Sequence, residues 1–283
     1  MKSQNNRIAG AVLIAGTIAT GAVPAEAGTS PSTRSAAREA SVDRRLSDSE
    51  ITESSGLARS TFKRNVLLTH NDSGDWARVF AVAPDGQTRA ELTLDGADAI
   101  DWEDISTGPG HSIWIGDIGD NGWSRDSITV YKFTEPADLT SSDVSWQSYD
   151  LEYEDGPRDA EALLVRPRSG RLFIVSKDED GGDIYRAPRR LSTSSTNTLK
   201  RVAAAPHSVT GGTFAPDGNS FVLVNYTRSY VYSRVGGPIR SETSKANNSS
   251  QGESVEVGRG GTRLLIGQEG SNSPVYRMPY NAP

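Results

Sequence analysis

Short apolar stretches alternate with polar, turn-rich stretches along most of the chain, and this pattern repeats five times. Each unit has a three-residue apolar core, then a polar turn that contains Gly, Asp, Asn or Ser, then a strand in which Val or Ile stands beside an aromatic residue. The apolar cores are 66–68, 113–115, 172–174, 221–223 and 264–266, and the second strands contain 79–80, 130–131, 184–185, 231–232 and 275–276. β-Branched and aromatic residues bounded by turn formers predict strands, not helices.

A third element precedes each pair of strands and sets the length of the repeat. It contains a hydroxyl residue in two units and a glutamate in the other three: Ser55, Glu103, Glu161, Thr210 and Glu253. These positions are 48, 58, 49 and 43 residues apart, which is the length of one four-stranded propeller blade. Outer strands are predicted over 89–94, 149–153 and 199–202.

The fifth unit ends at Tyr280 with only three strands, so its fourth strand must come from elsewhere. The segment from Arg45 to Thr52, ahead of the first unit, can supply that strand and leave no open edge. We therefore predict an all-β chain, with a five-bladed β-propeller closed by an N-terminal strand as a single domain over 46–283. A six-bladed ring is the alternative, because propellers commonly hold four to eight blades.

The first 27 residues have the pattern of a secretory signal peptide. Lys2 and Arg7 precede an apolar run over 8–23, and Ala25-Glu26-Ala27 forms a small-x-small cleavage site. We expect a secreted, extracellular protein with no membrane span once this segment is removed. Residues 28–45 are predicted to be a flexible lead-in, and the Ser/Asn-rich stretch 241–251 a surface loop.

Composition narrows the possible functions. The 283 residues include no cysteine, and 30 Lys and Arg stand against 36 Asp and Glu, for a net charge of −6. The chain therefore has no disulfide, thiolate zinc site or cysteine nucleophile. An acidic balance without a long basic block predicts no nucleic-acid partner. We expect a monomer that is held by packing, or by a bound ion.

The first strand of every propeller blade lines the central channel. The residues at the starts of those strands, Ser55, Glu103, Glu161, Thr210 and Glu253, should therefore meet at one mouth. Three carboxylates in one place repel each other unless they are protonated, paired with cations or bound to a metal. Hard oxygen ligands favour Ca²⁺. The alternative is that the glutamates cap strand ends, with Lys177 and Arg158 as counter-ions.

The order Ser, Glu, Glu, Thr, Glu at these five positions resembles that of the soluble calcium-activated nucleotidases, or apyrases. That family has five-bladed propellers whose channel calcium is held by Ser, Glu, Glu, Ser and Glu. The resemblance implies Ca²⁺ at the five positions, with Thr210 in place of a serine, but it does not extend to the nucleotide-contacting loops. Segments 101–105, 158–164 and 252–254 also resemble uncharacterised secreted actinobacterial propellers and, loosely, esterase-like phytases.

Two functions follow from this sequence. The first is a calcium-binding propeller that binds a small molecule, a polymer or a protein at its channel mouth. The second is a calcium-dependent hydrolase of phosphoesters, nucleotidase-like or phytase-like, in which Asp72, Asp117 or Glu269 is the base and Lys177 neutralises phosphate. His70, beside Asp72, could also act as acid or base. The predicted channel mouth is mostly acidic and would repel a polyanionic substrate, which favours the binding function over phosphoester hydrolysis.

Overall fold

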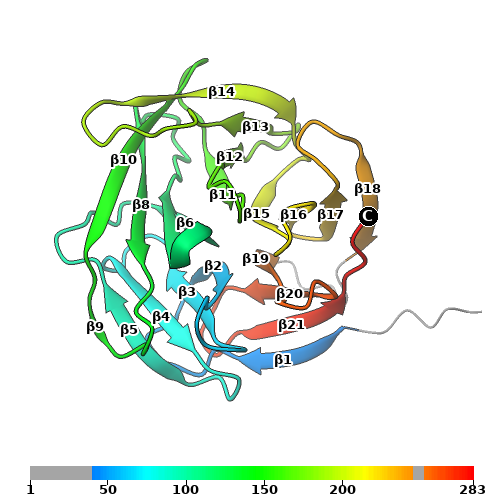
Figure 1. Ribbon diagram of the computed structural model, residues 1–283. Coiled ribbons are helices and arrows are strands. Elements are labelled where there is room, and N and C mark those ends of the chain that lie inside the picture. The colour runs from blue at the N-terminus through cyan, green and yellow to red at the C-terminus, as the bar shows by residue number, and fades with distance from the viewer. Residues whose placement is uncertain (1–39, 245–251) are drawn as a thin grey trace, which may run out of the picture. The chain divides into compact units, whose positions relative to one another are not determined.

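Almost all regular structure in this protein is β-strand, as the sequence predicts (Figure 1). The computed structural model describes residues 40–244 and 252–283. Within those residues the strands form four hydrogen-bonded sheets, of four, eight, four and five strands. One short 3-10 helix, η1 (Pro109–His111), is the only helical element in the described part of the chain.

The first two sheets in chain order are antiparallel except for one parallel pair of strands each. The five-stranded sheet has the order β2 (Ser54–Arg59), β3 (Leu67–Asn71), β4 (Arg78–Val82), β5 (Thr88–Thr93) and β9 (Ser142–Asp143), with β5 and β9 as its parallel pair. Half of the eight-stranded sheet is β6 (Trp102–Thr107), β7 (Ser112–Asp117), β8 (Ile128–Thr134) and β10 (Trp146–Tyr153). Its other half is β11 (Ala160–Val165), β12 (Leu172–Ser176), β13 (Asp183–Arg186) and β14 (Asn197–Ala204), joined through the parallel pair β10 and β14.

The two remaining sheets have four strands each. One contains β15 (Val209–Phe214), β16 (Phe221–Asn225), β17 (Arg228–Tyr232) and β18 (Ile239–Ser244). The other contains β19 (Gly252–Val257), β20 (Arg263–Gln268), β21 (Pro274–Pro279) and, from the start of the described chain, β1 (Ser41–Arg45). The predicted outer strands over 89–94, 149–153 and 199–202 correspond to β5, β10 and β14.

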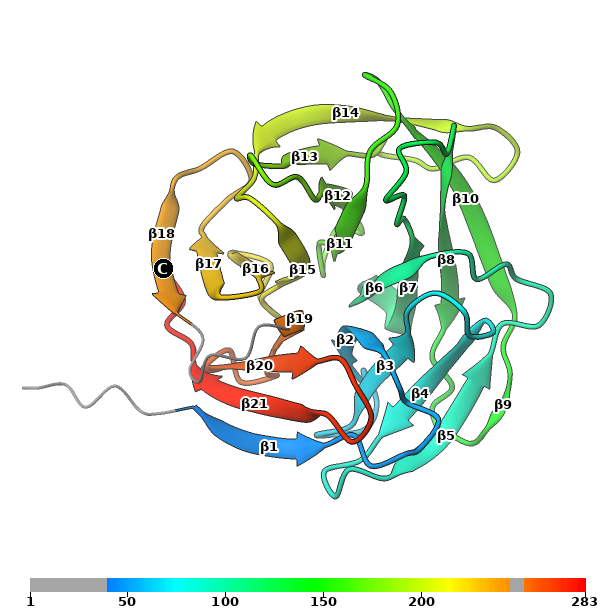
Figure 2. The same ribbon diagram turned by 180° about the vertical axis from the view of Figure 1, so that it is seen from behind.

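The first strands of the five units lie innermost and contact one another in turn. β2 contacts β6, β6 contacts β11, β11 contacts β15, β15 contacts β19, and β19 contacts β2 again (Figures 1 and 2). Apolar side chains of successive sheets pack between them; Leu68, Trp102 and Phe133, for example, belong to one buried cluster. The inner strands therefore close a ring, and their starts lie around its centre.

The strand that completes the last sheet begins earlier than the sequence predicts. β1 pairs with β21, Ser41 opposite Arg277 and Arg45 opposite Pro274, whereas the closing strand was expected over 45–52. Leu46 and Ile51, which suggested that strand, are instead fully buried in an apolar cluster. Backbone pairing with β21 and the contacts of Arg44 with the carbonyls of Asn65 and Val82 hold the polar segment 41–45, so part of the predicted flexible lead-in is a strand.

A second difference concerns the segment predicted as a surface loop over 241–251. Its first residues belong to β18, an outer strand whose side chains are all exposed. An exposed edge strand needs no apolar residue, so the polar, Ser-rich sequence of β18 has no apolar alternation from which a strand could be predicted. Residues 245–251 and the predicted signal peptide, 1–27, lie outside the described residues. In the part of the chain that is described, no helix is long and apolar enough to span a membrane.

Candidate metal centre

The five residues predicted as ligands occupy equivalent places in the fold. Each inner strand has a register shift against its neighbour near its start, and Ser55, Glu103, Glu161, Thr210 and Glu253 lie within those shifts. A β-bulge leaves one residue out of the ladder and turns its side chain in a new direction. The repeat found in the sequence is therefore also a repeat of backbone irregularity.

The carboxylates that converge closely are only partly those of the predicted set. Asp72, Asp101 and Glu103 each offer an oxygen atom, and these atoms all lie within 4.8 Å of one another. Asp72 follows β3, while Asp101 and Glu103 flank the start of β6. One Asp72 oxygen, Oδ1, is buried without a hydrogen-bond partner. We call these three residues the acidic cluster.

Gly119, after β7, makes room for the acidic cluster. A Cβ atom at this position would lie 2.3 Å from Asp101 Oδ2 and 2.3 Å from Glu103 Oε1. Both carboxylates therefore occupy space that any other residue would fill. The backbone N–H of Gly119 donates to the Asp101 carbonyl at 3.2 Å, which holds this loop against the cluster.

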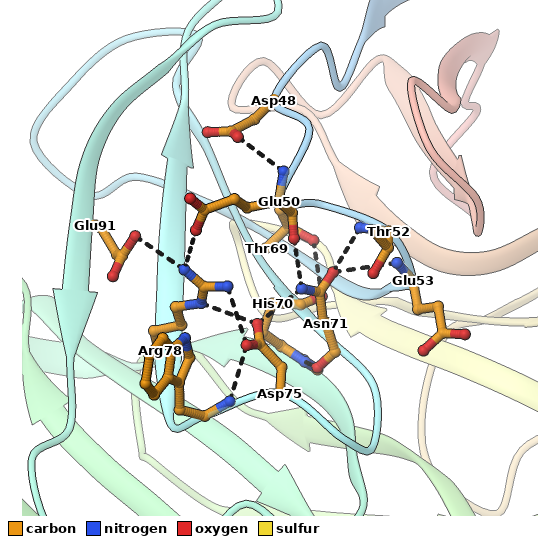
Figure 3. A network of polar contacts seen from close by, with 11 residues as sticks. Asp48, Glu50, Thr52, Glu53, Thr69, His70, Asn71, Asp75, Arg78 and Glu91 are labelled. Atoms are coloured by element: carbon orange, nitrogen blue, oxygen red, sulfur yellow. Dashed lines mark hydrogen bonds and ion pairs between the residues drawn. The ribbon is translucent and has the colours of Figure 1, made fainter.

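A hydrogen-bond network fixes the loop that carries Asp72 (Figure 3). Asn71 Oδ1 accepts from the backbone N–H groups of Thr52 and Glu53 at 3.0 and 3.1 Å. The Asn71 amide donates to Asp75 Oδ2 at 2.7 Å, and Arg78 donates to both Asp75 oxygens at 2.9 and 3.0 Å. Asp72 is therefore flanked by residues with several fixed contacts, so its position is set by the loop.

The electrostatics of the acidic cluster are unfavourable for three ionised groups. Burial is the largest cause that raises each of the three pKa values. Repulsion from nearby carboxylates raises them further, and for Asp101 and Glu103 these include members of the cluster itself. The pKa of Asp101 is raised to about 6, and that of Glu103 lies well above its usual range. The cations that oppose these shifts, Arg125 and Lys177, are paired with other carboxylates. A divalent cation would relieve this repulsion.

The other predicted ligands have protein partners. Glu161 is ion-paired with Lys177, and burial still raises its pKa to about 7. Thr210 Oγ1 donates to the Gly252 carbonyl at 2.7 Å, and Ser55 Oγ donates to the Glu103 carbonyl at 2.7 Å. Of the two counter-ions expected in the strand-capping alternative, Lys177 pairs with Glu161, whereas Arg158 is ion-paired with Asp155 at 3.3 Å.

The candidate catalytic residues have different surroundings. Asp117 is fully buried, accepts from the backbone N–H groups of Ile100 and Asp101 at 3.1 and 3.2 Å, and is ion-paired with Arg125 at 2.8 Å. Glu269 is half-buried, and burial together with the nearby Asp72 charge raises its pKa.

His70 lies in the core rather than at the mouth. Its side chain is fully buried and packs edge-on against Trp102 at 5.6 Å. Its Nδ1 lies 2.8 Å from the Asn71 carbonyl, and burial lowers its pKa to about 4. Without solvent access, His70 has no route to a substrate. Its position beside Asp72 in the sequence gave the opposite impression.

Asp101 is the member of the acidic cluster that sequence reasoning missed. It lies two residues before Glu103, and alternation along an extended chain places residues two apart on the same side. The Asp-Trp-Glu order was therefore the available signal. It was overlooked because the repeats were aligned on one residue per unit, although two of the other units also have an acidic residue two positions earlier, Glu53 and Asp159.

Three large apolar side chains are exposed on loops next to the acidic cluster. Trp76 lies in the loop that carries Asp72, Ile100 immediately precedes Asp101, and Trp123 follows Gly119 in the β7–β8 loop. Their exposed fractions are 73%, 60% and 50%. Arg78 and Arg158 lie over the two indole rings, 5.6 and 5.5 Å from the ring centres. We call Trp76, Ile100 and Trp123 the apolar rim.

Comparisons with known proteins establish the fold but no family. No protein-family model matches the chain, and a search of curated proteins finds no match. A solved structure of a glucose dehydrogenase aligns with a TM-score of 0.53 and 10% identity, covering 86% of this chain and 99% of that one. The soluble aldose sugar dehydrogenase of Escherichia coli aligns with a TM-score of 0.50 and 13% identity, over 86% and 99% of the two chains.

This chain is therefore structurally similar to β-propeller sugar dehydrogenases. At identities this low the similarity concerns the fold alone. The resemblance to the calcium-activated nucleotidases stays confined to the short motifs at the strand starts.

Proposed function

We propose that this chain is a secreted, calcium-binding propeller that binds a ligand at the mouth of its channel. The observation that carries the proposal is the acidic cluster, in which oxygens of Asp72, Asp101 and Glu103 lie within 4.8 Å of one another. Their charges have no direct ion-pair partner among the described residues, and Asp72 Oδ1 is buried without a hydrogen bond. Secretion is supported by the leader pattern of residues 1–27.

Calcium suits these donors better than a transition metal does. The cluster offers carboxylate oxygens and no histidine, and the chain contains no cysteine. Ca²⁺ takes six to eight oxygen ligands in flexible geometry, so three carboxylates leave positions for water or for oxygens of a ligand. A bound Ca²⁺ would supply positive charge and a Lewis-acidic centre. The protein's own residues hold it, with Gly119 leaving the carboxylates space.

Five blades are supported by the way the sheets are assembled. The eight-stranded sheet consists of two antiparallel groups joined by the parallel pair β10 and β14. Dividing it there gives five groups, each beginning with one of the inner strands β2, β6, β11, β15 and β19, which contact each other in a closed series. We propose that each group is one blade, in line with the five sequence repeats.

The apolar rim supports a ligand that has an apolar face and several oxygen atoms. Trp76 and Trp123 expose indole rings on the loops that carry Asp72 and Gly119, and exposed aromatic residues are typical of binding surfaces. A carbohydrate offers both features, since its hydroxyls can complete the coordination of Ca²⁺ while its ring lies against an indole. The proteins of similar fold are also named for sugars, glucose and aldose.

A second candidate function is calcium-dependent hydrolysis of a phosphoester. Lys177 favours it, because this half-buried cation lies near both Asp72 and Glu161 and could contact a phosphate held by the metal. Glu269 would then be the base, since it is half-buried and burial raises its pKa above that of a free glutamate. The assay is calcium-stimulated release of phosphate from nucleotides and from phytate, and no turnover with either would remove this candidate.

Calorimetric titration with CaCl₂ tests the proposed metal site. The protein without its leader should bind Ca²⁺, and Glu103→Gln should weaken binding at least about tenfold, or ~1.4 kcal/mol. Glu179→Gln is the matched control, because Glu179 is an exposed glutamate with no side-chain contact in the described structure. No heat of binding, or equal affinity in the Glu103→Gln protein, would contradict the proposal.

A further variant separates the acidic cluster from the ligand set predicted by sequence. Glu253 belongs to the predicted five and not to the cluster. Glu253→Gln should therefore leave the calcium affinity within about twofold of wild type, since only a long-range charge is removed. A loss as large as that of Glu103→Gln would favour the five-residue ring instead.

A further inference from the structure

A second site lies at the opposite end of β2 from the acidic cluster. A cavity of about 620 Å³ opens where β2 ends at Arg59 and the chain turns towards β3. The start of β2 lies beside Asn71, and its end lies beside Leu67, so the strand separates the two sites. The last sheet supplies the other wall, through the β19–β20 turn and β21.

The lining of this cavity is strongly basic although the chain as a whole is acidic. Six arginines contribute to it: Arg44, Arg59, Arg64, Arg259, Arg263 and Arg277. Asp43 is the one carboxylate in the lining. Such a concentration of guanidinium groups in a protein of net charge −6 produces a local positive potential. We call these six residues the arginine pocket.

The partners of these arginines leave much of the positive charge uncompensated. Arg44 and Arg277 share Asp43, at 3.0 and 3.9 Å, and Arg59 is ion-paired with Glu256 from outside the lining. Arg259 donates to the carbonyls of Ser60 and Thr61 at 2.8 and 3.1 Å, contacts that orient a guanidinium without neutralising it.

Arg64 and Arg263 are the two arginines whose charge is most available. In the described part of the chain neither forms an ion pair or a side-chain hydrogen bond, and both are exposed. Their guanidinium groups can therefore reach a ligand without breaking a contact that supports the fold.

We propose that the arginine pocket binds a small organic phosphate ester. Guanidinium groups present paired N–H donors that match the oxygen atoms of phosphate, and several of them together compensate its double negative charge. The floor is apolar, with Val66, Leu67 and Leu265 among the lining residues, so the organic part of the ligand has a surface to contact. The cavity volume lies in the range of small-molecule sites.

This site is independent of the proposed metal centre. Its donors are cationic guanidinium groups, so it needs no metal to bind an anion, and these groups repel calcium ions. An anionic ligand therefore has a site at the opposite end of β2 from the acidic cluster. Buffers for its test contain EDTA, so that no phosphate is held at the acidic cluster through a metal.

The experiment is a calorimetric titration at pH 8 with glucose 6-phosphate, inorganic phosphate, glucuronate and glucose as probes. Glucose 6-phosphate should bind, inorganic phosphate and glucuronate should bind more weakly, and glucose should not bind. The double variant R64Q/R263Q should bind glucose 6-phosphate at least about tenfold more weakly. Arg168→Gln is the control, since Arg168 is an exposed arginine outside the pocket with no side-chain contact in the described structure.

Four results would overturn the proposal. They are no binding of any probe, equal affinity of R64Q/R263Q and wild type, an equal loss in the Arg168→Gln protein, and glucuronate binding as tightly as glucose 6-phosphate. If inorganic phosphate binds as tightly as the ester, the apolar floor contributes nothing to affinity. The proposal that the pocket prefers an organic ester would then be wrong. Melting curves of all variants check that each is folded.

Discussion

The two ends of β2 are opposite in charge and differ in how the protein treats that charge. At its start, Asp72, Asp101 and Glu103 gather with raised pKa values, and the nearby cations are paired elsewhere. At its end, the six residues of the arginine pocket share the cavity lining with one carboxylate, Asp43. A modest net charge therefore conceals two separate concentrations of charge, each of which favours a ligand of the opposite sign.

The two ends also differ in rigidity. The acidic cluster is fixed by backbone features, the bulge at Glu103 and the close approach of Gly119. In the arginine pocket, the exposed Arg64 and Arg263 are free of side-chain contacts within the described residues. A metal ion needs preplaced oxygens, whereas an organic anion can be met by side chains that adjust. The comparison can be tested by changing one end and measuring binding at both.

The largest effect should come from removing two charges of the acidic cluster. In the double variant Asp72→Asn/Asp101→Asn, calcium affinity should fall at least about a hundredfold, ~2.7 kcal/mol, because two anionic ligands are lost. Without calcium, the variant should melt at a higher temperature than wild type, since the repulsion that raises these pKa values is gone.

Calorimetry and melting curves measured in EDTA check both parts of this prediction. Binding of glucose 6-phosphate at the arginine pocket should stay as in wild type. A parallel loss at both ends would mean that the variant is damaged as a whole, and the comparison would fail.

The sequence predicts that acidic residues gather at the channel mouth, but it does not predict which of them converge in the acidic cluster. The register of the five units was readable because each inner strand repeats the same bulge. Which side chains converge depends on the loops at the ends of the inner strands. Asp72 lies in the β3–β4 loop of the first unit and Asp101 in the loop before β6, and their approach depends on the particular contacts of Asn71 and Gly119.

The arginine pocket shows the same limit in another form. Its members are spread from Arg44 to Arg277 and form no basic block in the sequence. They meet because β1 pairs with β21 and thereby brings the two ends of the described chain together. Closure was predicted from the missing fourth strand of the last unit, but the strand was placed over 45–52. Leu46 and Ile51 of that segment pack in the core, and residues 41–45 pair with β21 instead.

The next largest effect should come from a change that leaves every charge in place. Gly119→Ala puts a Cβ atom 2.3 Å from oxygens of Asp101 and Glu103, so both carboxylates must move apart. We expect calcium affinity to fall about 30-fold, or ~2 kcal/mol, because ligand geometry and not charge is altered. Gly122→Ala is the control, since a Cβ there meets only Ser124 Oγ at 3.6 Å. Equal calcium affinity of the Gly119→Ala protein and wild type would show that Ca²⁺ is attracted by the negative charge alone, without dependence on the positions of the Asp101 and Glu103 carboxylates.

Acidification should weaken one end of β2 and spare the other. The pKa of Asp101 is raised to about 6, so this carboxyl is mostly ionised at pH 7 and mostly protonated at pH 5. Calcium must displace that proton, and its affinity should fall roughly tenfold between these pH values. In EDTA the sign is reversed: the folded state binds more protons than the unfolded chain between about pH 4 and 6, so stability falls as pH rises through that window.

Calorimetry at the two pH values, with glucose 6-sulfate as the probe for the arginine pocket, measures this difference. Neither a guanidinium group nor a sulfate ester titrates in this range, so binding of the sulfate should change less than about twofold. A calcium affinity that is equal at pH 5 and pH 7 would exclude Asp101 as a ligand.

The smallest effect should be a gain at the arginine pocket. Glu256 is fully buried, and it holds Arg59 through an ion pair and through the backbone N–H of Arg59 at 3.2 Å. Glu256→Gln keeps the shape of the side chain but frees the positive charge of Arg59, which lines the pocket. Affinity for glucose 6-phosphate should rise about threefold, ~0.7 kcal/mol, while the melting temperature falls because the partly buried Arg59 has lost its partner. Unchanged affinity together with a lower melting temperature would mean that Arg59 serves only to join β2 to β19, and that the phosphate is held by the exposed arginines alone.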